Sequence, residues 1–540
     1  MLAASDQRRL VAALVRGLDT GGVAVTRVLE THISYVLLTG VHAYKIKKAV
    51  EFSFLDFRTL EARRFFCRRE LELNRRLAPA LYLGVVPITG SEQAPILNGQ
   101  GPAIEYAVKM REFAQDALAS ALLDRGELGP PDIDALAAIV ADFHQTIDVA
   151  GPANAHGTPA GILRLALQNV TEIDWLATSD ADRRQVADLR AWTENAFRLR
   201  HDSFLRRLER GFVRECHGDL HLANIARIDG KLVVFDGIEF NDELRWIDTM
   251  SEVAFTAMDL DHRGRADLSH RFLNAYLERT GDYAGVEVLS FYLVYRALVR
   301  GKVALLRAAQ EAGTAATESR GEAAHYLALA TKYAASPQPA VIVTCGLSGS
   351  GKTTIAEALL ERIGAVRVRS DVERKRMRGM SALSRSSHEV DGGLYAPEET
   401  RATYERLRDL ARATVQAGRT VIVDATFLRR EQRQAFRALA AELRVPFGIL
   451  AVEAPEATLR ERIRQRRATD SDASDADLAV LDHQIATHEP LTDDERSCAI
   501  DGAAVLEFPG IASATSKGRE TQWPWNLYPV YPRVADCGSA

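Results

Sequence analysis

The sequence predicts an α+β domain of two lobes, followed by an α/β domain with a parallel sheet. Three observations predict this. A strand-like alternation near the N-terminus gives way to a long region of helical periodicity, and helix and strand patterns alternate after about residue 338. Between these two regions, residues 334–340 have the small residues and prolines of a short linker. A chain of 540 residues is expected to hold more than one domain, because single cores rarely grow past ~300 residues.

The charge balance gives no reason to expect nucleic acid as the main partner. There are 68 Lys and Arg residues against 73 Asp and Glu residues, for a net charge of −5. The 5 cysteines lack Cys-x-x-Cys spacing, which argues against a metal site or a disulfide framework and fits a reducing compartment. The N-terminus lacks the features of a signal peptide, and no apolar run approaches the ~20 residues of a membrane helix. We therefore expect a cytoplasmic protein without a membrane partner.

Two lysines stand at the end of a predicted strand near the N-terminus. Lys45 ends an Ala-x-Lys sequence of the kind that presents a lysine to nucleotide phosphates. Lys47 follows on the same face of the strand, so the choice between the two stays open. The next helix, predicted over residues 59–77, offers Glu70 and Glu72 as partners for such a lysine.

The other elements of this half complete one small lobe and one large lobe. Strands at residues 85–88 and 103–110 are expected to finish the small, mixed lobe. Helical patterns over residues 132–146, 162–208 and 254–329 predict a larger helical lobe that shapes an acceptor cleft.

Asp219, Asn224 and Asp236 have the spacing of a magnesium-dependent catalytic loop. Asp219 and Asn224 lie five residues apart in the segment CHGDLHLANI, and Asp236 follows twelve residues later at the end of an apolar strand. A carboxylate can accept the proton of an acceptor hydroxyl, and a neutral amide can bind Mg²⁺ without repelling that carboxylate. A second carboxylate can hold the metal that bridges the phosphates of ATP. The set predicts kinase-type phosphoryl transfer.

These residues carry a resemblance to the aminoglycoside phosphotransferase family, which has a protein-kinase-like fold. HGDLHLANI matches the family's His-Gly-Asp-x-His-x-x-Asn pattern, and the resemblance covers about the first 335 residues. It implies that Asp219 is the catalytic base and that Asn224 and Asp236 bind Mg²⁺. It also implies that Lys45 contacts the phosphates, although no Gly-x-Gly-x-x-Gly precedes it and the turn in THISYVLL would have to cover them. The acceptor stays open, because the fold is shared by enzymes that act on antibiotics, sugars and choline.

Three residues near this loop are interpreted as supports. His217 is expected to brace the loop. His221 is either structural or near the substrate, and we favour the structural role. Asp248 falls where such folds have a structural acid that holds the catalytic loop, so we do not expect it to be catalytic.

A complete phosphate-binding loop follows an apolar strand in the C-terminal half. The segment GLSGSGKTT has the spacing Gly-x4-Gly-Lys-Thr between a predicted strand and a predicted helix. Glycine N–H groups can close around a polyphosphate where a Cβ would collide, and the helix N-terminus faces the same anion. We expect Lys352 to reach the β- and γ-phosphates of ATP and Thr353 to bind Mg²⁺. The predicted nucleotide-binding residues of the loop are Gly346, Ser348, Gly349, Ser350, Gly351, Lys352, Thr353 and Thr354.

Two acids follow the next predicted strands. Strands are expected at residues 365–368, 421–424 and 447–452, and Asp371 and Asp424 stand at the ends of the first two. Ligands of open α/β sheets bind outside the carboxyl ends of the strands, so both acids are expected to face the phosphates. A helix further on is rich in arginine and is predicted to be a lid over the transferring phosphate. Its arginines are Arg460, Arg462, Arg464, Arg466 and Arg467.

This half resembles the small P-loop kinases grouped with zeta toxins, polynucleotide kinases and gluconate kinase. Besides the loop and the lid, the shared features are the Ser-Asp-x-x-Arg sequence around Asp371 and the strand that ends in Asp424. The resemblance implies that Asp371 activates the acceptor hydroxyl, that Arg374 holds the acceptor or its phosphate, and that Asp424 organises Mg²⁺ or its water. Ala425 and Thr426 follow where motor ATPases usually have a second acid, which favours a kinase.

The sequence as a whole predicts a bifunctional kinase that uses ATP and Mg²⁺. Residues 1–335 are expected to form the aminoglycoside phosphotransferase-like domain, residues 336–508 the P-loop kinase domain, and residues 509–540 a tail. Each site would transfer the γ-phosphoryl group to a hydroxyl of a small molecule or, in the P-loop half, of a polynucleotide end. Two alternatives are a nucleotide-binding sensor domain that regulates a P-loop ATPase or kinase, and a nucleotide-hydrolysing switch.

Overall fold

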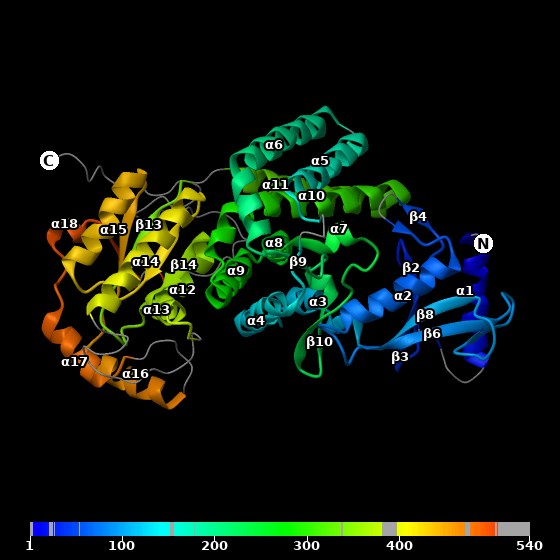
Figure 1. Ribbon diagram of the computed structural model, residues 1–540, viewed down its shortest axis with the longest axis horizontal. Helices are drawn as coiled ribbons and strands as arrows, with labels where there is room; N and C mark the ends of the chain where they lie inside the picture. The colour runs from blue at the N-terminus through cyan, green and yellow to red at the C-terminus, as the bar shows by residue number, and fades with distance from the viewer. Residues whose placement is uncertain are drawn as a thin grey trace. The chain divides into compact units, whose positions relative to one another are not determined.

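Figure 1 shows the computed structural model of the chain, coloured from blue at the N-terminus to red at the C-terminus. The structure describes residues 4–20, 25, 27–52, 55–151, 156–177, 179–335, 338–380, 397–469, 476–502 and 505, so the predicted tail lies outside the described residues. The chain divides into a first unit, Met1–Gln168 with Phe204–Asp259, and a second unit, Asn169–Ser203 with Leu260–Ala540. Within the described ranges, no helix combines the length and the hydrophobicity that a membrane span needs.

The first unit begins with a six-stranded antiparallel sheet in the order β1-β2-β3-β8-β6-β7. Helix α1, Ala4–Thr20, buries Leu10 and Leu14 against Leu37 and Ile46 of the sheet. The strands are β1 Arg27–Glu30, β2 Ser34–Leu38, β3 His42–Lys47, β6 Tyr82–Gly90, β7 Pro95–Leu97 and β8 Glu105–Arg111, and a hairpin of β4 Glu51–Phe52 and β5 Leu55–Asp56 follows β3.

Helix α2, Leu60–Asn74, lies against this sheet in Figure 1. It begins where the Thr59 side chain accepts a hydrogen bond from Ala62 N at 3.0 Å, which satisfies one of the free N–H groups of the first turn. Its Cys67 packs with Tyr82 and Val108 in a second buried cluster. The predicted helix over residues 59–77 is confirmed, although it ends three residues early.

The rest of the first unit consists of helices and two short two-stranded sheets. Strand β10 pairs with β11 and strand β9 with β12, both antiparallel. The elements are α3 Ala119–Asp124, α4 Pro130–Thr146, β9 Val213–Glu215, β10 Ile225–Ile228, β11 Lys231–Val234, α7 Asp242–Arg245, β12 Trp246–Asp248 and α8 Thr249–His262. Helices α5 Pro159–Leu176 and α6 Asp180–Glu209 are shared between the units. An antiparallel sheet followed by helices is the α+β class that the sequence predicted.

The second unit contains three long helices ahead of an α/β domain. Helices α10, Val286–Gln310, and α11, Gly313–Ala334, are consecutive, and a contact of 2.7 Å between Arg307 Nη2 and Glu322 Oε2 joins them. Helix α9, Ala266–Thr280, ends at Gly281, whose φ of 76° is the left-handed conformation that a helix C-cap favours.

The α/β domain has a five-stranded parallel sheet in the order β14-β15-β13-β16-β17. The strands are β13 Val341–Cys345, β14 Val366–Arg369, β15 Val421–Asp424, β16 Phe447–Ala451 and β17 Ala499–Asp501. The helices are α12 Lys352–Ile363, α13 Ser370–Met377, α14 Pro397–Gln416, α15 Arg430–Leu443, α16 Glu456–Thr469, α17 Leu478–Thr487 and α18 Asp493–Arg496. The predicted parallel sheet is confirmed, with β17 as an added edge strand.

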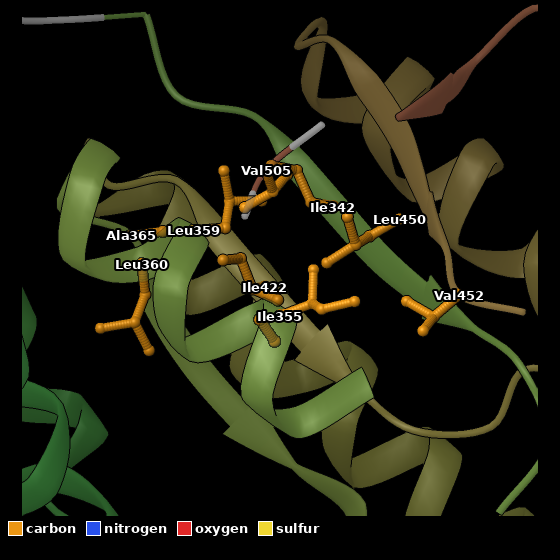
Figure 2. Packing of buried hydrophobic residues seen from close by; sticks show 10 residues of the cluster. Ile342, Ile355, Leu359, Leu360, Ala365, Ile422, Leu450, Val452 and Val505 are labelled. Carbon is orange, nitrogen blue, oxygen red and sulfur yellow. The ribbon is translucent and has the colours of Figure 1, made fainter. Parts of the chain in front are cut away.

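The core of this domain lies between α12 and the sheet. Figure 2 shows Ile342, Ile422 and Leu450 of three adjacent strands packed with Ile355 and Leu359 of the helix. Because the strands are parallel, their carboxyl ends meet at one edge, where the segments after β13, β14 and β15 come together. The fold thus places the phosphate loop and both predicted acids at the same edge.

Candidate active sites

The catalytic-loop residues of the first unit lie together as the sequence predicted. Asn224 Nδ2 donates hydrogen bonds to the backbone oxygen and to Oδ2 of Asp219, each at 2.9 Å. Strands β10 and β11 then form a hairpin in which Phe235 N donates to Asn224 O at 2.9 Å, which brings Asp236 back beside Asn224. Asp236 has a φ of 64°, a strained conformation of the kind that is found at functional sites. Lys45 forms an ion pair with Asp236 and completes the group.

Lys45 and Lys47 share one glutamate in the interior of the first unit. Lys45 Nζ lies 2.9 Å from Glu70 Oε1 and Lys47 Nζ lies 2.6 Å from Glu70 Oε2, and Lys47 also pairs with Glu239. Burial would lower the pKa of Lys45, but Asp236 and Glu70 raise it well above its ordinary value. Burial would raise the pKa of Glu70, but the two lysines lower it to about 2. Both lysines are therefore charged, and Lys45 is the one that reaches Asp236.

These contacts show which of the two lysines reaches Asp236 and which of the two glutamates pairs with the lysines, both of which the sequence left open. Glu70 is the acid that pairs with the lysines, whereas Glu72 pairs at 3.4 Å with Arg69 on an exposed face. The sequence interpretation missed Glu239, which lies three residues after Asp236 and is buried. The signal in the sequence that could have indicated Glu239 was its short spacing from Asp236, with two residues between the two acids.

Glu252 of α8 holds the predicted catalytic loop. Glu252 accepts hydrogen bonds from His217 N at 3.1 Å, from Gly218 N at 2.7 Å and from the ring of His144 at 3.1 Å. Burial would raise the pKa of Glu252, but the hydrogen bond from His144 and the charges of His144 and His217 lower it to about 2. Gly218 has a φ of 87°, and a Cβ there would lie 2.7 Å from Leu244 O. Glu252 was missed because nothing in its local sequence marks it.

The three predicted supports are all buried. The Nε2 atom of His217 is 2.8 Å from Phe235 O, which ties the loop to the strand before Asp236. His221 is buried, its Nδ1 accepts from Ala223 N at 3.3 Å, and its Nε2 is 3.4 Å from Asp219 Oδ2. Asp248 is buried and accepts hydrogen bonds from Nε and Nη2 of Arg207, at 2.7 and 2.8 Å.

In the second unit, the phosphate loop joins β13 to α12 and is packed too closely for side chains at two glycines. A Cβ on Gly346, whose φ is 155°, would lie 2.3 Å from Val452 O, and one on Gly349, whose φ is 83°, would lie 2.8 Å from Leu459 O. Lys352 is buried, and its Nζ donates to Leu347 O at 2.8 Å. Ser350 Oγ is buried and has no hydrogen-bond partner among the residues that the structure describes. Such a loop can offer N–H groups and an unpaired hydroxyl to an anion.

A cavity of about 340 Å³ opens beside this loop and brings the predicted residues together. Gly346 and Ser350 do not line it. The predicted residues that do are Ser348, Gly349, Gly351, Lys352, Thr353, Thr354, Asp371, Arg374 and Asp424. The structure thus places the loop lysine and threonine and both strand-end acids around one space.

Asp371 and Asp424 have different surroundings in this cavity. Asp371 Oδ1 lies 3.2 Å from Arg374 Nη1. Asp424 is 5% exposed, and its Oδ2 has no hydrogen-bond partner in the described part of the chain. A buried carboxylate oxygen that accepts no hydrogen bond from the described residues, in the same cavity as a threonine at the start of α12, is the oxygen-donor chemistry that Mg²⁺ prefers, so the residues present fit this metal.

The predicted arginine lid is only partly at the cavity. Arg462 donates to Ser350 O at 3.0 Å and to Gly349 O at 3.3 Å, which places it on the phosphate loop. Arg460 pairs with Glu456 at 2.8 Å and with Asp482 at 2.5 Å, and Arg464 is 3.8 Å from Glu461. The side chains of Arg466 and Arg467 lie outside the described residues.

Among the cavity residues that were not predicted from sequence, Gln484 and Arg369 contact predicted site residues. Gln484 of α17 accepts a hydrogen bond from Ser348 N at 2.9 Å, and Arg369 lies next to Asp424 at the end of β14. Gln484 carried no recognisable motif, and the Arg369 side chain could have been read as a solvated charge at a strand end.

Comparison with known proteins places the chain in a family. The family model of the AAA domain matches residues 341–491, the stretch that holds the phosphate loop and the cavity. An uncharacterized protein of Mycobacterium tuberculosis, Rv2004c, is 31% identical over 458 residues, which is 84% of this chain and 89% of that protein. The chain belongs to the family of this mycobacterial protein. The uncharacterized protein Mb2027c of Mycobacterium bovis, also in this family, matches with the same identity and coverage.

Three solved structures are similar to a share of the chain. A choline/ethanolamine kinase family protein of Mesorhizobium loti is 12% identical, covers 62% of this chain and 98% of its own, and has a TM-score of 0.36. An aminoglycoside phosphotransferase of Alicyclobacillus acidocaldarius is 14% identical, covers 58% of this chain and 91% of its own, and has a TM-score of 0.34. A gluconokinase of Sinorhizobium meliloti is 20% identical, covers 32% of this chain and 89% of its own, and has a TM-score of 0.23.

Proposed function

We propose that the chain is an ATP-dependent phosphotransferase with two independent kinase sites. The observation that carries the proposal is the cavity of the second unit, where Lys352, Thr353, Asp371, Arg374 and Asp424 surround one space. A nucleotide-binding loop facing a carboxylate and an arginine is the combination that transfer to a hydroxyl needs, because such transfer depends mostly on positioning and charge neutralisation. We place the two sites in domains that meet near residue 336, in a protein of the cytoplasm.

In the P-loop site, each residue has a role that its surroundings support. Lys352 and the loop N–H groups bind the β- and γ-phosphates of ATP, and Thr353 and Asp424 hold Mg²⁺. Asp371 accepts the proton of the acceptor hydroxyl, and Arg374, 3.2 Å away, orients that carboxylate and holds the acceptor. When bound, Mg²⁺ neutralises charge on the transferring phosphate. The acceptor is a small molecule or a polynucleotide end with a free hydroxyl.

In the first unit, the equivalent roles fall on a different set of residues. Asp219 accepts the hydroxyl proton, and the amide of Asn224 fixes one of its oxygens while remaining able to bind Mg²⁺. Asp236 is the second metal ligand. Lys45, kept charged by two carboxylates, binds the ATP phosphates and exchanges its Asp236 partner for them when nucleotide enters.

An acceptor screen on the full-length chain tests the proposal. ADP release is measured with sugars, nucleosides, choline, aminoglycosides and 5′-hydroxyl oligonucleotides, in the unchanged chain and in Asp219→Ala and Lys352→Ala variants. Each substitution is expected to remove a different acceptor-dependent activity. Asp229→Ala, at an exposed turn, and Lys332→Ala, at an exposed helix position, are matched controls and should remove neither.

Three results would contradict the proposal in different ways. Loss of both activities in one variant would mean that the sites are not independent. ADP release that no acceptor changes would indicate the nucleotide-hydrolysing switch. Acceptor-dependent release that Asp219→Ala leaves intact, together with nucleotide binding in the first unit, would indicate a sensor domain.

The role of Asp371 has its own test. Asp371→Asn should lower the rate of phosphoryl transfer far more than it weakens ATP binding, because a general base acts in the chemical step. An equal loss of nucleotide affinity would make Asp371 a ligand of metal or phosphate instead.

A further inference from the structure

Helix α9 contacts the α/β domain at the strand and the helix that form its active-site cavity. The Asn274 side chain donates to Ala365 O, just before β14, at 2.9 Å and accepts from Arg367 N of β14 at 2.7 Å. His270 Nδ1 donates to Glu361 O at 2.8 Å in the last turn of α12, the helix that starts at Lys352. Although α9 precedes the predicted domain boundary, it is thus fixed to β14, the strand directly before the helix of Asp371, and to α12, the helix that starts at the loop lysine.

Glu278 is the acid with which α9 reaches the cavity wall. Its Oε1 lies 2.9 Å from Arg369 Nη1 and its Oε2 lies 3.1 Å from Arg367 Nη2, while Arg376 donates to its backbone oxygen. Burial would raise the pKa of Glu278, but Arg369 and Arg367 lower it, so the carboxylate is charged. The carboxylate and the backbone oxygen of Glu278 are therefore both held by arginines.

Arg369 stands between Glu278 and Asp424. Residues Arg369 and Asp424 are register partners on adjacent parallel strands, and both line the cavity. The Arg369 Nε atom is 3.9 Å from Asp424 Oδ2, whereas its Nη1 atom is 2.9 Å from Glu278. The nearer carboxylate takes the hydrogen bond, and Asp424 Oδ2 stays without a hydrogen-bond partner within the described ranges.

We propose that Glu278 is a positioning residue of the P-loop site: it holds Arg369 back from Asp424 and so keeps that carboxylate available to Mg²⁺. The proposal rests on the proposed function, in which Asp424 is a metal ligand. The physical reason is competition, because a guanidinium paired with the Asp424 carboxylate neutralises its charge and repels a divalent cation from it. Without the charge of Glu278, the Arg369 guanidinium, which favours bidentate carboxylate pairing, is drawn towards Asp424, whose Oδ2 is already 3.9 Å from its Nε.

The test measures metal dependence of nucleotide binding and not activity. Binding of the fluorescent analogue mant-ATP to the full-length chain is titrated with Mg²⁺, and the part of the signal that Lys352→Ala removes is assigned to the P-loop site. Glu278→Gln keeps the size of the side chain but removes its charge. It should raise the Mg²⁺ concentration for half-maximal binding by about tenfold, the size expected when an opposite charge moves to a carboxylate.

Two further variants separate this role from a structural one. In Glu278→Gln with Arg369→Ala, the competing arginine is gone, so the Mg²⁺ midpoint should return to within about twofold of the unchanged chain. Arg369→Ala alone should lower the midpoint or leave it unchanged, and it answers the question even where Glu278→Gln does not fold. Glu322→Gln, which breaks the pair with Arg307 on α10, is the matched control and should not move the midpoint.

The outcomes distinguish this inference from the function on which it rests. A Glu278→Gln midpoint equal to that of the unchanged chain, with mant-ATP binding still lost in Lys352→Ala, would overturn the inference alone. A higher midpoint in Arg369→Ala would also overturn it. Mg²⁺-dependent binding that neither Lys352→Ala nor Asp424→Asn reduces would refute the proposed site, and this inference with it.

Discussion

The side-chain amide of Asn224 holds one carboxylate oxygen of Asp219 at 2.9 Å. In the proposed function, the Asp219 carboxylate accepts the proton of the acceptor hydroxyl. We predict that Asp219→Asn lowers the rate of acceptor phosphorylation at this site by about 10²–10⁴-fold, because the amide cannot take a proton. Binding of mant-ATP should change little. Steady-state kinetics with the acceptor found by the screen check this, with Asp229→Asn as a control on an exposed acid; parallel loss of nucleotide binding would contradict it.

Lys47→Met should destabilise the first unit strongly. Lys47 is fully buried between Glu70 and Glu239, so its loss leaves excess negative charge in the interior. Breaking a buried ion pair in this way costs about 3–5 kcal/mol. Urea denaturation gives the free energy of unfolding directly.

The next residue in the chain is the control. Lys48 is itself 14% exposed, but its partner Glu30, at 2.8 Å, is 46% exposed, so loss of this ion pair in Lys48→Met should cost no more than about 1 kcal/mol. Equal losses of unfolding free energy in the two variants would show that the buried ion pairs of Lys47 stabilise the fold no more than the ion pair of Lys48.

The stability of the first unit should fall in acid because of Glu70 and Glu252. The pKa of each lies at about 2 in the folded chain, below its ordinary value. A depressed carboxyl pKa stabilises the fold above the unfolded value and loses that contribution as the pH falls through the folded value. The free energy of unfolding should therefore decline from about pH 4.5 towards about pH 2.

Glu252→Gln tests this pH dependence. The variant should be less stable than the unchanged chain near neutral pH and should show a flatter decline in acid, since one of the two groups no longer titrates. Denaturation curves at a series of pH values measure both effects. Glu61→Gln, at an exposed position of α2, should keep the original slope, and a Glu252→Gln chain with an unchanged slope would contradict the assignment.

Gly349→Ala should weaken nucleotide binding at the P-loop site. The residue combines a φ of 83° with a Cβ position 2.8 Å from Leu459 O, so the loop must move away from α16. We expect mant-ATP binding to weaken by about tenfold or more. Gly418 has a φ of 81° and open space around its Cβ position, so Gly418→Ala carries the same backbone strain without the clash. If both variants bind mant-ATP equally well, the close packing around Gly349 is not the reason why nucleotide binding needs a glycine there.

Much of the site could be predicted where the chemistry is local in sequence. The spacing of Asp219, Asn224 and Asp236, and the loop around Lys352, are short motifs whose backbone geometry brings their members together. Asp371 and Asp424 could be placed because parallel strands end at one edge, so strand position alone indicates proximity.

The residues that escaped prediction act through partners far away in the chain. Lys47 and Glu239 are 192 positions apart, and Arg369 and Glu278 are 91 positions apart. No periodicity or motif links such pairs, because only the folded backbone brings them together. The same reason explains why Lys45 and Lys47 could not be separated from sequence, since they share a strand face and differ only in which distant acid they meet.

The contact between α9 and β14 also has a consequence for how the α/β domain can be isolated. β14 is an edge strand, and its outward-facing groups are covered: Asn274 bonds Ala365 O and Arg367 N, and the Tyr283 hydroxyl donates to Arg367 O at 3.4 Å. An uncovered edge strand pairs readily with another chain and promotes aggregation. A fragment cut at residue 336 would expose this edge, so a fragment meant to stay monomeric needs to begin before α9.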